Sequence, residues 1–153
     1  MNAFKNKGNC LTSLEKYSEA IECYEKAIQF NPNDVSSLKN KGKNLDNLKR
    51  HAEAIECYEK LIQINEKDLV AINNIGISLR NLGRYQEAID YFNKAIQINP
   101  DEADGFYNKA NCLNYLGNYI EAIELYDRAI QISPHDPDSF NNKGILIFIF
   151  NIS

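Results

Sequence analysis

Residues 17–32 read Tyr-Ser-Glu-Ala-Ile-Glu-Cys-Tyr-Glu-Lys-Ala-Ile-Gln-Phe-Asn-Pro. Three later segments of the chain are similar to this one and align with it without a gap. The later copies begin at His51, Tyr85 and Tyr119, so each starts 34 residues after the previous one. Glu-Ala-Ile and Ile-Gln keep their places in all four copies. A fixed period of this length indicates a chain built from stacked copies of one small structural repeat.

A second segment precedes each copy, and its apolar and small residues trace one face of a helix. In the first repeat they are Phe4, Gly8, Leu11 and Leu14. Steps of four and then three residues match the helical period of 3.6 residues per turn. The equivalent segments begin at Leu38, Ile72, Phe106 and Phe140. Each repeat is therefore predicted to contain two amphipathic helices, a first helix A and a second helix B.

Proline marks the predicted end of helix B. Proline disfavours a helical conformation in the residue before it and cannot donate a hydrogen bond to the helix. It occurs at Pro32, Pro100 and Pro134, whereas Glu66 takes this place in the second repeat, where we expect a looser turn of the same kind. A single array of repeats is predicted, with boundaries at 1–34, 35–68, 69–102, 103–136 and a partial fifth repeat, 137–153.

The small residues at positions 8 and 20, the aromatic residue at position 24 and the proline at position 32 make the chain similar to the tetratricopeptide repeat family. The resemblance covers the whole chain. It implies an all-α fold, a right-handed α-solenoid of antiparallel helix pairs, and a function in binding other proteins without catalysis. The small residues at positions 8 and 20 are expected to let the two helix backbones of a repeat approach closely.

Position 7 departs from the family pattern, because lysine replaces the usual leucine in four repeats. The residues are Lys7, Lys41, Lys109 and Lys143. Their stems are expected to lie along the edge of the core, with the ammonium groups in water.

An asparagine stands at position 6 of every repeat, as Asn6, Asn40, Asn74, Asn108 and Asn142. The resemblance implies that this position faces the concave surface, where ligands of such arrays usually lie. An asparagine amide offers both a donor and an acceptor, so a row of them can bind the main chain of an extended peptide. The row is similar to that in the repeats of O-linked N-acetylglucosamine transferases. The alternative is that these amides bond within the groove or to water.

Further side chains are predicted to line the same surface, which should be basic toward its N-terminal end. A bound segment is therefore predicted to include an acidic stretch. Besides the row of asparagines, the predicted peptide-binding residues are Lys5, Asn9, Lys39, Lys43, Arg80, Tyr107 and Asn111.

Two other functions remain open at this stage. The chain could be the targeting domain of a larger enzyme such as a glycosyltransferase. It could also resemble the co-chaperones that hold the C-terminal carboxylate of a chaperone, since Lys5, Asn9 and Asn40 match the first part of that clamp. Val70 and Asn74 stand where the clamp needs lysine and arginine, and a frame moved by one repeat is also incomplete. Such a clamp would lack the charge-assisted bonds that fix a carboxylate.

Composition argues against several classes of function. With 17 basic and 21 acidic residues the net charge is -4, so no nucleic-acid partner is predicted. The N-terminus lacks the apolar region of a secretory signal, and no apolar run approaches the about 20 residues that cross a bilayer. No membrane association is therefore predicted. The predicted location is the cytoplasm.

No metal site or cofactor is predicted. The four cysteines, Cys10, Cys23, Cys57 and Cys112, include no Cys-x-x-Cys pair and are expected to be small buried thiols. His51 and His135 are expected to lack a partner that would make either a base or a ligand.

The chain ends on the apolar residues 145–150, inside the partial fifth repeat. An exposed apolar segment of this kind indicates self-association or aggregation. Two explanations stay open: a hydrophobic surface used for a dimer or partner, or a chain that is cut from a longer array or ended by an out-of-frame translation.

Overall fold

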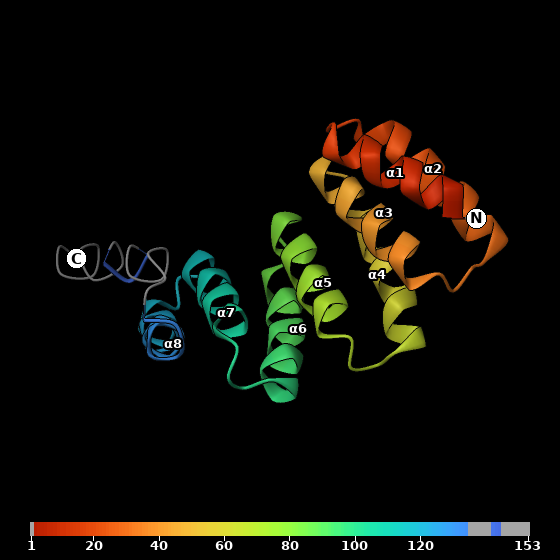
Figure 1. Cartoon of the computed structure of the whole chain (residues 1–153). Coiled ribbons are helices and arrows are strands. Elements are labelled where there is room, and N and C mark those ends of the chain that lie inside the picture. Colours follow the sequence, from red (N-terminus) through yellow and green to blue (C-terminus); the bar gives the residue numbers. More distant parts are fainter. Residues whose placement is uncertain (1, 135–141, 145–153) are drawn as a thin grey trace. The chain divides into compact units, whose positions relative to one another are not determined.

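The computed structural model describes residues 2–134 and 142–144, and every structural statement below concerns these residues. They contain helices and turns and no strand (Figure 1). The helices are α1 (Asn2–Ser13), α2 (Tyr17–Phe30), α3 (Val35–Asn47), α4 (His51–Ile64), α5 (Leu69–Asn81), α6 (Tyr85–Ile98), α7 (Ala103–Tyr115) and α8 (Tyr119–Ile132).

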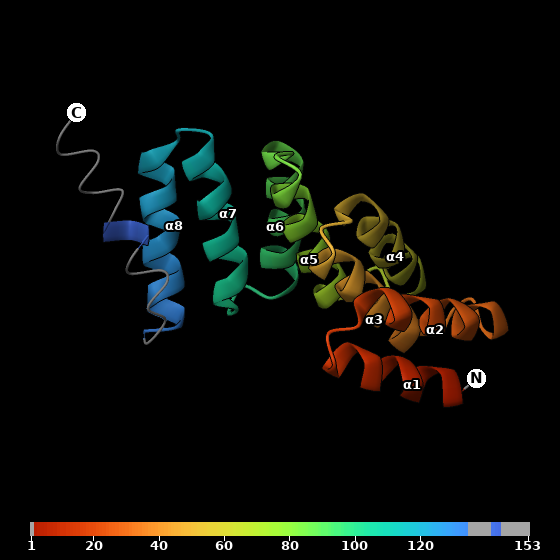
Figure 2. The same cartoon turned by 90° about the horizontal axis from the view of Figure 1, so that it is seen from above.

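Turns of three or four residues connect these helices, so the helices of the pairs α1–α2, α3–α4 and α7–α8 run antiparallel. Helix α1 packs against α2, α3 against α4, and α7 against α8, and this pairing is visible from both directions (Figures 1 and 2). Helices α2 and α3, α4 and α5, and α6 and α7 also pack together. The predicted all-α fold of antiparallel helix pairs is confirmed.

The described residues form two compact bodies, which divide between Leu82 and Gly83. The N-terminal body holds α1 to α5 and the C-terminal body holds α6 to α8.

The aromatic residues at position 24 form the centre of the core. Tyr24 and Tyr58 are each 1% exposed, and Phe92 and Tyr126 are completely buried. A Cβ atom placed on Gly8 would lie 2.7 Å from Cε1 of Tyr24, and one on Gly42 would lie 2.6 Å from Cε1 of Tyr58. The expectation that position 8 serves a close approach of two backbones is thereby corrected. The glycine makes room for an aromatic ring from helix B.

The turn after helix B is the same with and without proline. Helix α4 ends at Ile64, the position equivalent to Phe30 at the end of α2. Asn65 has φ -142°, close to the -141° of Asn31. The Asp68 N–H donates to the Asn65 carbonyl over 3.0 Å, as Asp34 does to Asn31. The expectation of a looser turn at Glu66 is wrong, because the asparagine and aspartate hold the turn.

The turn between helices A and B requires a left-handed backbone in every complete repeat. Glycine takes this position at Gly83 (φ 74°) and Gly117 (φ 80°), but Glu15 (φ 57°) and Lys49 (φ 58°) take it in the first two repeats. A side chain with a Cβ atom costs free energy in this conformation.

We therefore expect Glu15→Gly and Lys49→Gly each to raise the free energy of unfolding by about 0.5–1 kcal/mol, measured by urea denaturation. Gly83→Ala is the matched reverse change and should lower it by about 1 kcal/mol. A loss of stability in both glycine variants would contradict this explanation.

Three of the position-7 lysines end on carboxylates of helix B, ion pairs that the expectation of ammonium groups in water did not include. Lys41 lies 2.8 Å from Glu25, and Lys109 lies 3.4 Å from Glu121. Lys143 pairs with Asp127, sixteen residues earlier, just as Lys41 pairs with Glu25. The side chains of Lys41 and Lys109 are largely buried, so their stems do follow the edge of the core.

Cysteine burial follows the packing of the helices. Cys23, Cys57 and Cys112 are buried as predicted, and burial raises the pKa of the Cys57 thiol. Cys10 is exposed, which corrects the prediction for this residue. The equivalent residues Asn44 and Ser78 are buried, because α2 packs on α3 and α4 packs on α5.

No helix in the described part of the chain is long and apolar enough to cross a membrane. The same part contains no cluster of three potential metal-ligating side chains. His135 and the apolar residues 145–150 lie outside the described residues, as does most of the fifth repeat.

Candidate functional site

One face of α3 presents polar side chains to solvent. Lys39, Asn40 and Lys43 lie within about 100° of one another around the helix, because each residue turns it by about 100°. Leu38, Gly42 and Leu45 occupy the opposite, buried side. Lys39 and Asn40 are partly exposed, and Lys43 is exposed. We call Lys39, Asn40 and Lys43 the α3 polar face.

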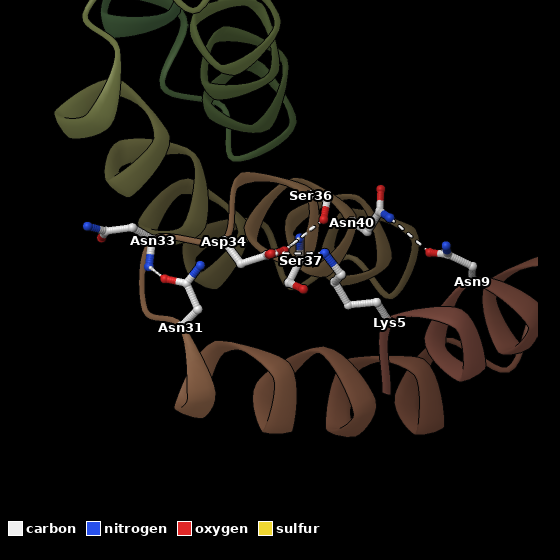
Figure 3. A network of polar contacts seen from close by, with 8 residues as sticks. All are labelled: Lys5, Asn9, Asn31, Asn33, Asp34, Ser36, Ser37 and Asn40. Carbon is white, nitrogen blue, oxygen red and sulfur yellow. Dashed lines mark hydrogen bonds and ion pairs between the residues drawn. The ribbon is translucent and has the colours of Figure 1, made fainter. Parts of the chain in front are cut away.

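The amide of Asn40 bonds to the exposed Asn9 on α1. Its Nδ2 donates to Oδ1 of Asn9 over 3.1 Å (Figure 3). The hydroxyl of Tyr24 donates to the same oxygen over 2.8 Å. Position 6 of one repeat is therefore joined to position 9 of the previous repeat and to the tyrosine at position 24.

The C-terminal body repeats this arrangement. Nδ2 of Asn142 donates to Oδ1 of Asn111 over 3.1 Å, and the Tyr126 hydroxyl donates to that oxygen over 2.7 Å. Asn142 also donates to the Tyr107 hydroxyl over 3.1 Å. The Tyr107 and Tyr126 rings are tilted against each other, with centroids 6.0 Å apart. Tyr107, Asn111 and Asn142 are thus brought together.

The remaining asparagines of the row differ from these two. Nδ2 of Asn74 is buried and has no hydrogen-bond partner among the described residues. Asn40 donates to position 9 of the previous repeat, and the equivalent position for Asn74 is Lys43. A lysine side chain has no acceptor, so this hydrogen bond cannot form. Asn108 is only 8% exposed, and its Nδ2 donates to the Asp104 carbonyl over 2.9 Å. Asn6 is exposed. The amides of one sequence row therefore stand in several environments.

Lys5 is engaged by the N-terminus of α3. Its ammonium group lies 3.0 Å from Oδ2 of Asp34 (Figure 3). Asp34 caps α3 by accepting from the Ser37 N–H over 2.9 Å, and it accepts from the Ser36 hydroxyl over 2.7 Å. Burial by itself raises the pKa of Asp34, but together these hydrogen bonds and Lys5 hold that pKa well below its usual range.

We expect Asp34→Ala to lower the free energy of unfolding by about 1–2 kcal/mol at neutral pH, because the helix loses its cap. The folded-state pKa lies below the unfolded value of about 3.9, so this stabilisation is complete above that value. It is lost as the pH falls below about 4, so the difference between wild type and variant should shrink there. Urea denaturation at several pH values measures it.

Asp68→Ala is the matched control for this prediction. Asp68 caps α5 by accepting from the Ala71 N–H over 2.9 Å, but it pairs with no lysine among the described residues. The loss on Asp68→Ala should therefore be smaller. Equal losses would show that Lys5 adds nothing to the cap.

Lys39 and Lys43 differ from the paired lysines, because neither forms an ion pair with a described residue. Both charges remain available on the α3 polar face. Arg80 lies in the last turn of α5 and is partly exposed.

A second polar cluster in the N-terminal body centres on Asp46. It accepts from the hydroxyl of Tyr58 over 3.0 Å and from the buried Ser78 hydroxyl over 2.8 Å. Nδ1 of His51 lies 2.8 Å from the same carboxylate. Burial, followed by the charge and hydrogen bond of Asp46, raises the pKa of Tyr58. His51 therefore has a carboxylate neighbour that the sequence interpretation did not include. Asp46 is a shared acceptor between helices α3, α4 and α5.

The hydroxyl groups of the position-24 tyrosines are the part of the site that the sequence interpretation missed, because it assigned that row to the core. A signal was present in the sequence. Tyrosine stands at position 24 where position 9 is asparagine, as in Tyr24 with Asn9 and Tyr126 with Asn111. The third repeat has Phe92 and Ile77 at these positions, and the second has Tyr58 with Lys43, so the pairing holds in one direction only.

The chain belongs to the tetratricopeptide repeat family. One model of this repeat matches residues 2–34, 70–102 and 103–136, and a second matches residues 35–68. No curated protein sequence matches the chain significantly.

Solved structures of MamA proteins share the fold. A MamA structure 25% identical in sequence has a TM-score of 0.86, covering 95% of this chain and 79% of that one. A second, 26% identical, has a TM-score of 0.84, covering 91% and 81%. MamA from Desulfovibrio magneticus RS-1 is 17% identical, with a TM-score of 0.89 over 98% and 85% of the chains, and shows the fold alone. The repeats and these neighbours identify the chain as a protein-protein interaction scaffold.

Proposed function

We propose that the exposed face formed by α1 and α3 binds an extended, acidic segment of a partner protein. The observation that carries this proposal is the pair Lys39 and Lys43, which forms no ion pair within the described part of the chain. The two lysines lie beside Asn40, whose amide is bonded to Asn9. Charge and main-chain hydrogen bonding are therefore offered by the same face.

The bonded amides keep capacity for a ligand. Oδ1 of Asn9 accepts twice, which leaves its Nδ2 as a donor, and Asn40 uses Nδ2, which leaves its Oδ1 as an acceptor. A peptide unit carries one carbonyl and one N–H group, and an extended chain presents these groups along both edges. The two amides can bind them without reading the side chains of the partner.

The two lysines add preference for acidic side chains. Exposed ion pairs each contribute about 0–1 kcal/mol and are screened by salt, so the complex should be weak and sensitive to ionic strength. Lys5 contributes less to such binding, because Asp34 already engages it.

The remaining predicted contacts extend this proposal. In the N-terminal body they are Asn6, Asn74 and Arg80. In the C-terminal body, Tyr107, Asn111 and Asn142 offer an equivalent amide pair beside a phenol. Asn108 is the weakest of these candidates, because its amide is buried and already bonded.

A charge-reversal experiment tests the proposal. The probe is a fluorescent peptide of about twelve residues, acetylated and amidated, with alternating glutamate and threonine, which extends to about 40 Å. Fluorescence anisotropy should show binding to wild type at about 0.05 M salt and weaker binding at about 0.5 M. Lys39→Glu with Lys43→Glu should weaken binding at least about tenfold, since two attractions become repulsions.

The matched control is Lys60→Glu with Lys67→Glu, which makes the same change in net charge on exposed positions of α4 and the turn after it. Binding should change little in this variant. Equal losses in the two variants would show attraction by overall charge alone. No binding of the acidic peptide to wild type at low salt would overturn the proposal.

A further inference from the structure

We infer that the buried hydroxyl groups of Tyr24 and Tyr126 are positioning groups for ligand binding, because they fix the amide orientation of Asn9 and Asn111. The inference rests on the proposed function, since it assigns a role to residues that the partner never touches. Two buried tyrosines would then determine which hydrogen-bonding groups the surface presents to a ligand.

The geometry in the N-terminal body favours one orientation of the Asn9 amide. The Tyr24 hydroxyl and Nδ2 of Asn40 both donate to Oδ1 of Asn9, over 2.8 Å and 3.1 Å. A carbonyl oxygen has two lone pairs, so Oδ1 is fully used. Rotation of the Asn9 amide alone would place its Nδ2 against Nδ2 of Asn40 and would remove the acceptor of the Tyr24 hydroxyl. In the orientation that the structure shows, Nδ2 of Asn9 remains available to a ligand.

Tyr24 can hold the amide because the tyrosine itself cannot move. Its ring is 1% exposed and lies on Gly8, where even a Cβ atom would be too close. The Thr12 hydroxyl lies 3.2 Å from the Tyr24 hydroxyl and gives it a second polar neighbour. By contrast, Asn9 is exposed, and the terminal torsion of a free asparagine is broad. The rigid residue orients the mobile one.

The C-terminal body shows the same contact independently. The Tyr126 hydroxyl and Nδ2 of Asn142 donate to Oδ1 of Asn111 over 2.7 Å and 3.1 Å. Tyr126 is completely buried, and Asn111 is partly exposed. The same orientation thus arises around a position-8 alanine, Ala110, in place of glycine.

The remaining repeats supply internal comparisons. In the second repeat, position 9 is Lys43, and the Tyr58 hydroxyl donates to Asp46 instead. In the third repeat, position 9 is Ile77 and position 24 is Phe92, so both polar groups are missing together. Among these four repeats, the tyrosine hydroxyl bonds to position 9 only in the two repeats that have an asparagine at that position.

The consequence for a ligand is a fixed order of hydrogen-bonding groups. Position 9 offers donors and position 6 of the next repeat offers an acceptor. A peptide carbonyl would meet Asn9, and a peptide N–H would meet Asn40. A freely rotating Asn9 would offer its donors for only part of the time and would lose orientation entropy on binding.

Tyr24→Phe tests the inference, because it removes one oxygen atom and leaves the ring in place. In the free protein, NMR relaxation should show an ordered Asn9 side-chain amide group in wild type and a mobile one in the variant. Affinity for the glutamate-threonine peptide should fall about fivefold, the effect of one hydrogen bond. Tyr58→Phe is the control, equally buried, and should leave both readouts unchanged.

A double-mutant cycle separates positioning from a general loss of structure. In an Asn9→Ala background, Tyr24→Phe should not reduce affinity further, because the amide through which it acts is gone. An equal, additive loss in that background would overturn the inference. So would an unchanged mobility of the Asn9 amide group in Tyr24→Phe, whether or not the peptide binds. An amide that becomes mobile in the variant, together with absent wild-type binding, would instead count against the proposed function, and the amide orientation would stand.

Discussion

Tyr58→Ala is expected to lower the free energy of unfolding by about 3–5 kcal/mol, the range for removing a buried aromatic side chain. The ring is 1% exposed and lies on Gly42, which has no side chain that could fill the space left behind. The Asp46 carboxylate would lose the hydroxyl that donates to it over 3.0 Å. Since single domains have only about 5–15 kcal/mol of stability, much of the variant should be unfolded under mild denaturing conditions.

Tyr58→Phe is the control, because it keeps the ring and removes only the hydroxyl. It should cost about 1 kcal/mol, the contribution of one hydrogen bond. Urea denaturation followed by circular dichroism measures both variants. If Tyr58→Ala costs no more than Tyr58→Phe, the ring is not the centre of this core.

Asp46→Ala is expected to cost about 2–4 kcal/mol, because two buried hydroxyl groups lose their acceptor. Ser78 is completely buried and Tyr58 nearly so, and both donate to this carboxylate. An unsatisfied buried donor costs about 1–3 kcal/mol, and the contact with His51 is lost as well. The carboxylate joins α3 to both α4 and α5, so its loss should loosen two helix contacts together.

Asp46→Asn keeps an acceptor oxygen at the same place and should retain more of the stability than Asp46→Ala. Asn47→Ala, on the exposed neighbouring residue, should change the free energy of unfolding by no more than about 0.5 kcal/mol. Urea denaturation of the three variants under identical conditions checks the order. A loss below about 0.5 kcal/mol in Asp46→Ala would show that water satisfies the buried hydroxyl groups.

The helix pairs could be predicted from the sequence because their causes are local and repeated four times. Apolar residues at helical spacing define the buried faces, and an Asn-x-x-Asp or Asn-x-x-Glu turn follows α2, α4 and α6 before the next helix A begins. The error at Glu66 has the same origin. Proline is the more conspicuous residue, but the neighbouring Asn65 and Asp68 hold that turn.

The candidate site could be predicted only in part. Position 6 was recognised as a row of asparagines, but identical residues do not imply identical environments. Asn40 donates to Asn9, whereas Asn74 follows a repeat with Lys43 at position 9, and its buried Nδ2 has no partner in the described part of the chain. These differences depend on residues about 31 positions away, which periodicity within one repeat cannot reveal.

The sequence by itself determined the period, the helix pairs and the tetratricopeptide class, because each follows from spacings within 34 residues. Only the tertiary structure decided which polar groups are engaged and which remain available. It placed Lys5 on Asp34 and left Lys39 and Lys43 without an ion-pair partner in the described chain. It also brought the Tyr24 hydroxyl to Asn9. The physical reason is that a hydrogen bond requires contact within about 3 Å, and such contacts between repeats form only when the helices stack.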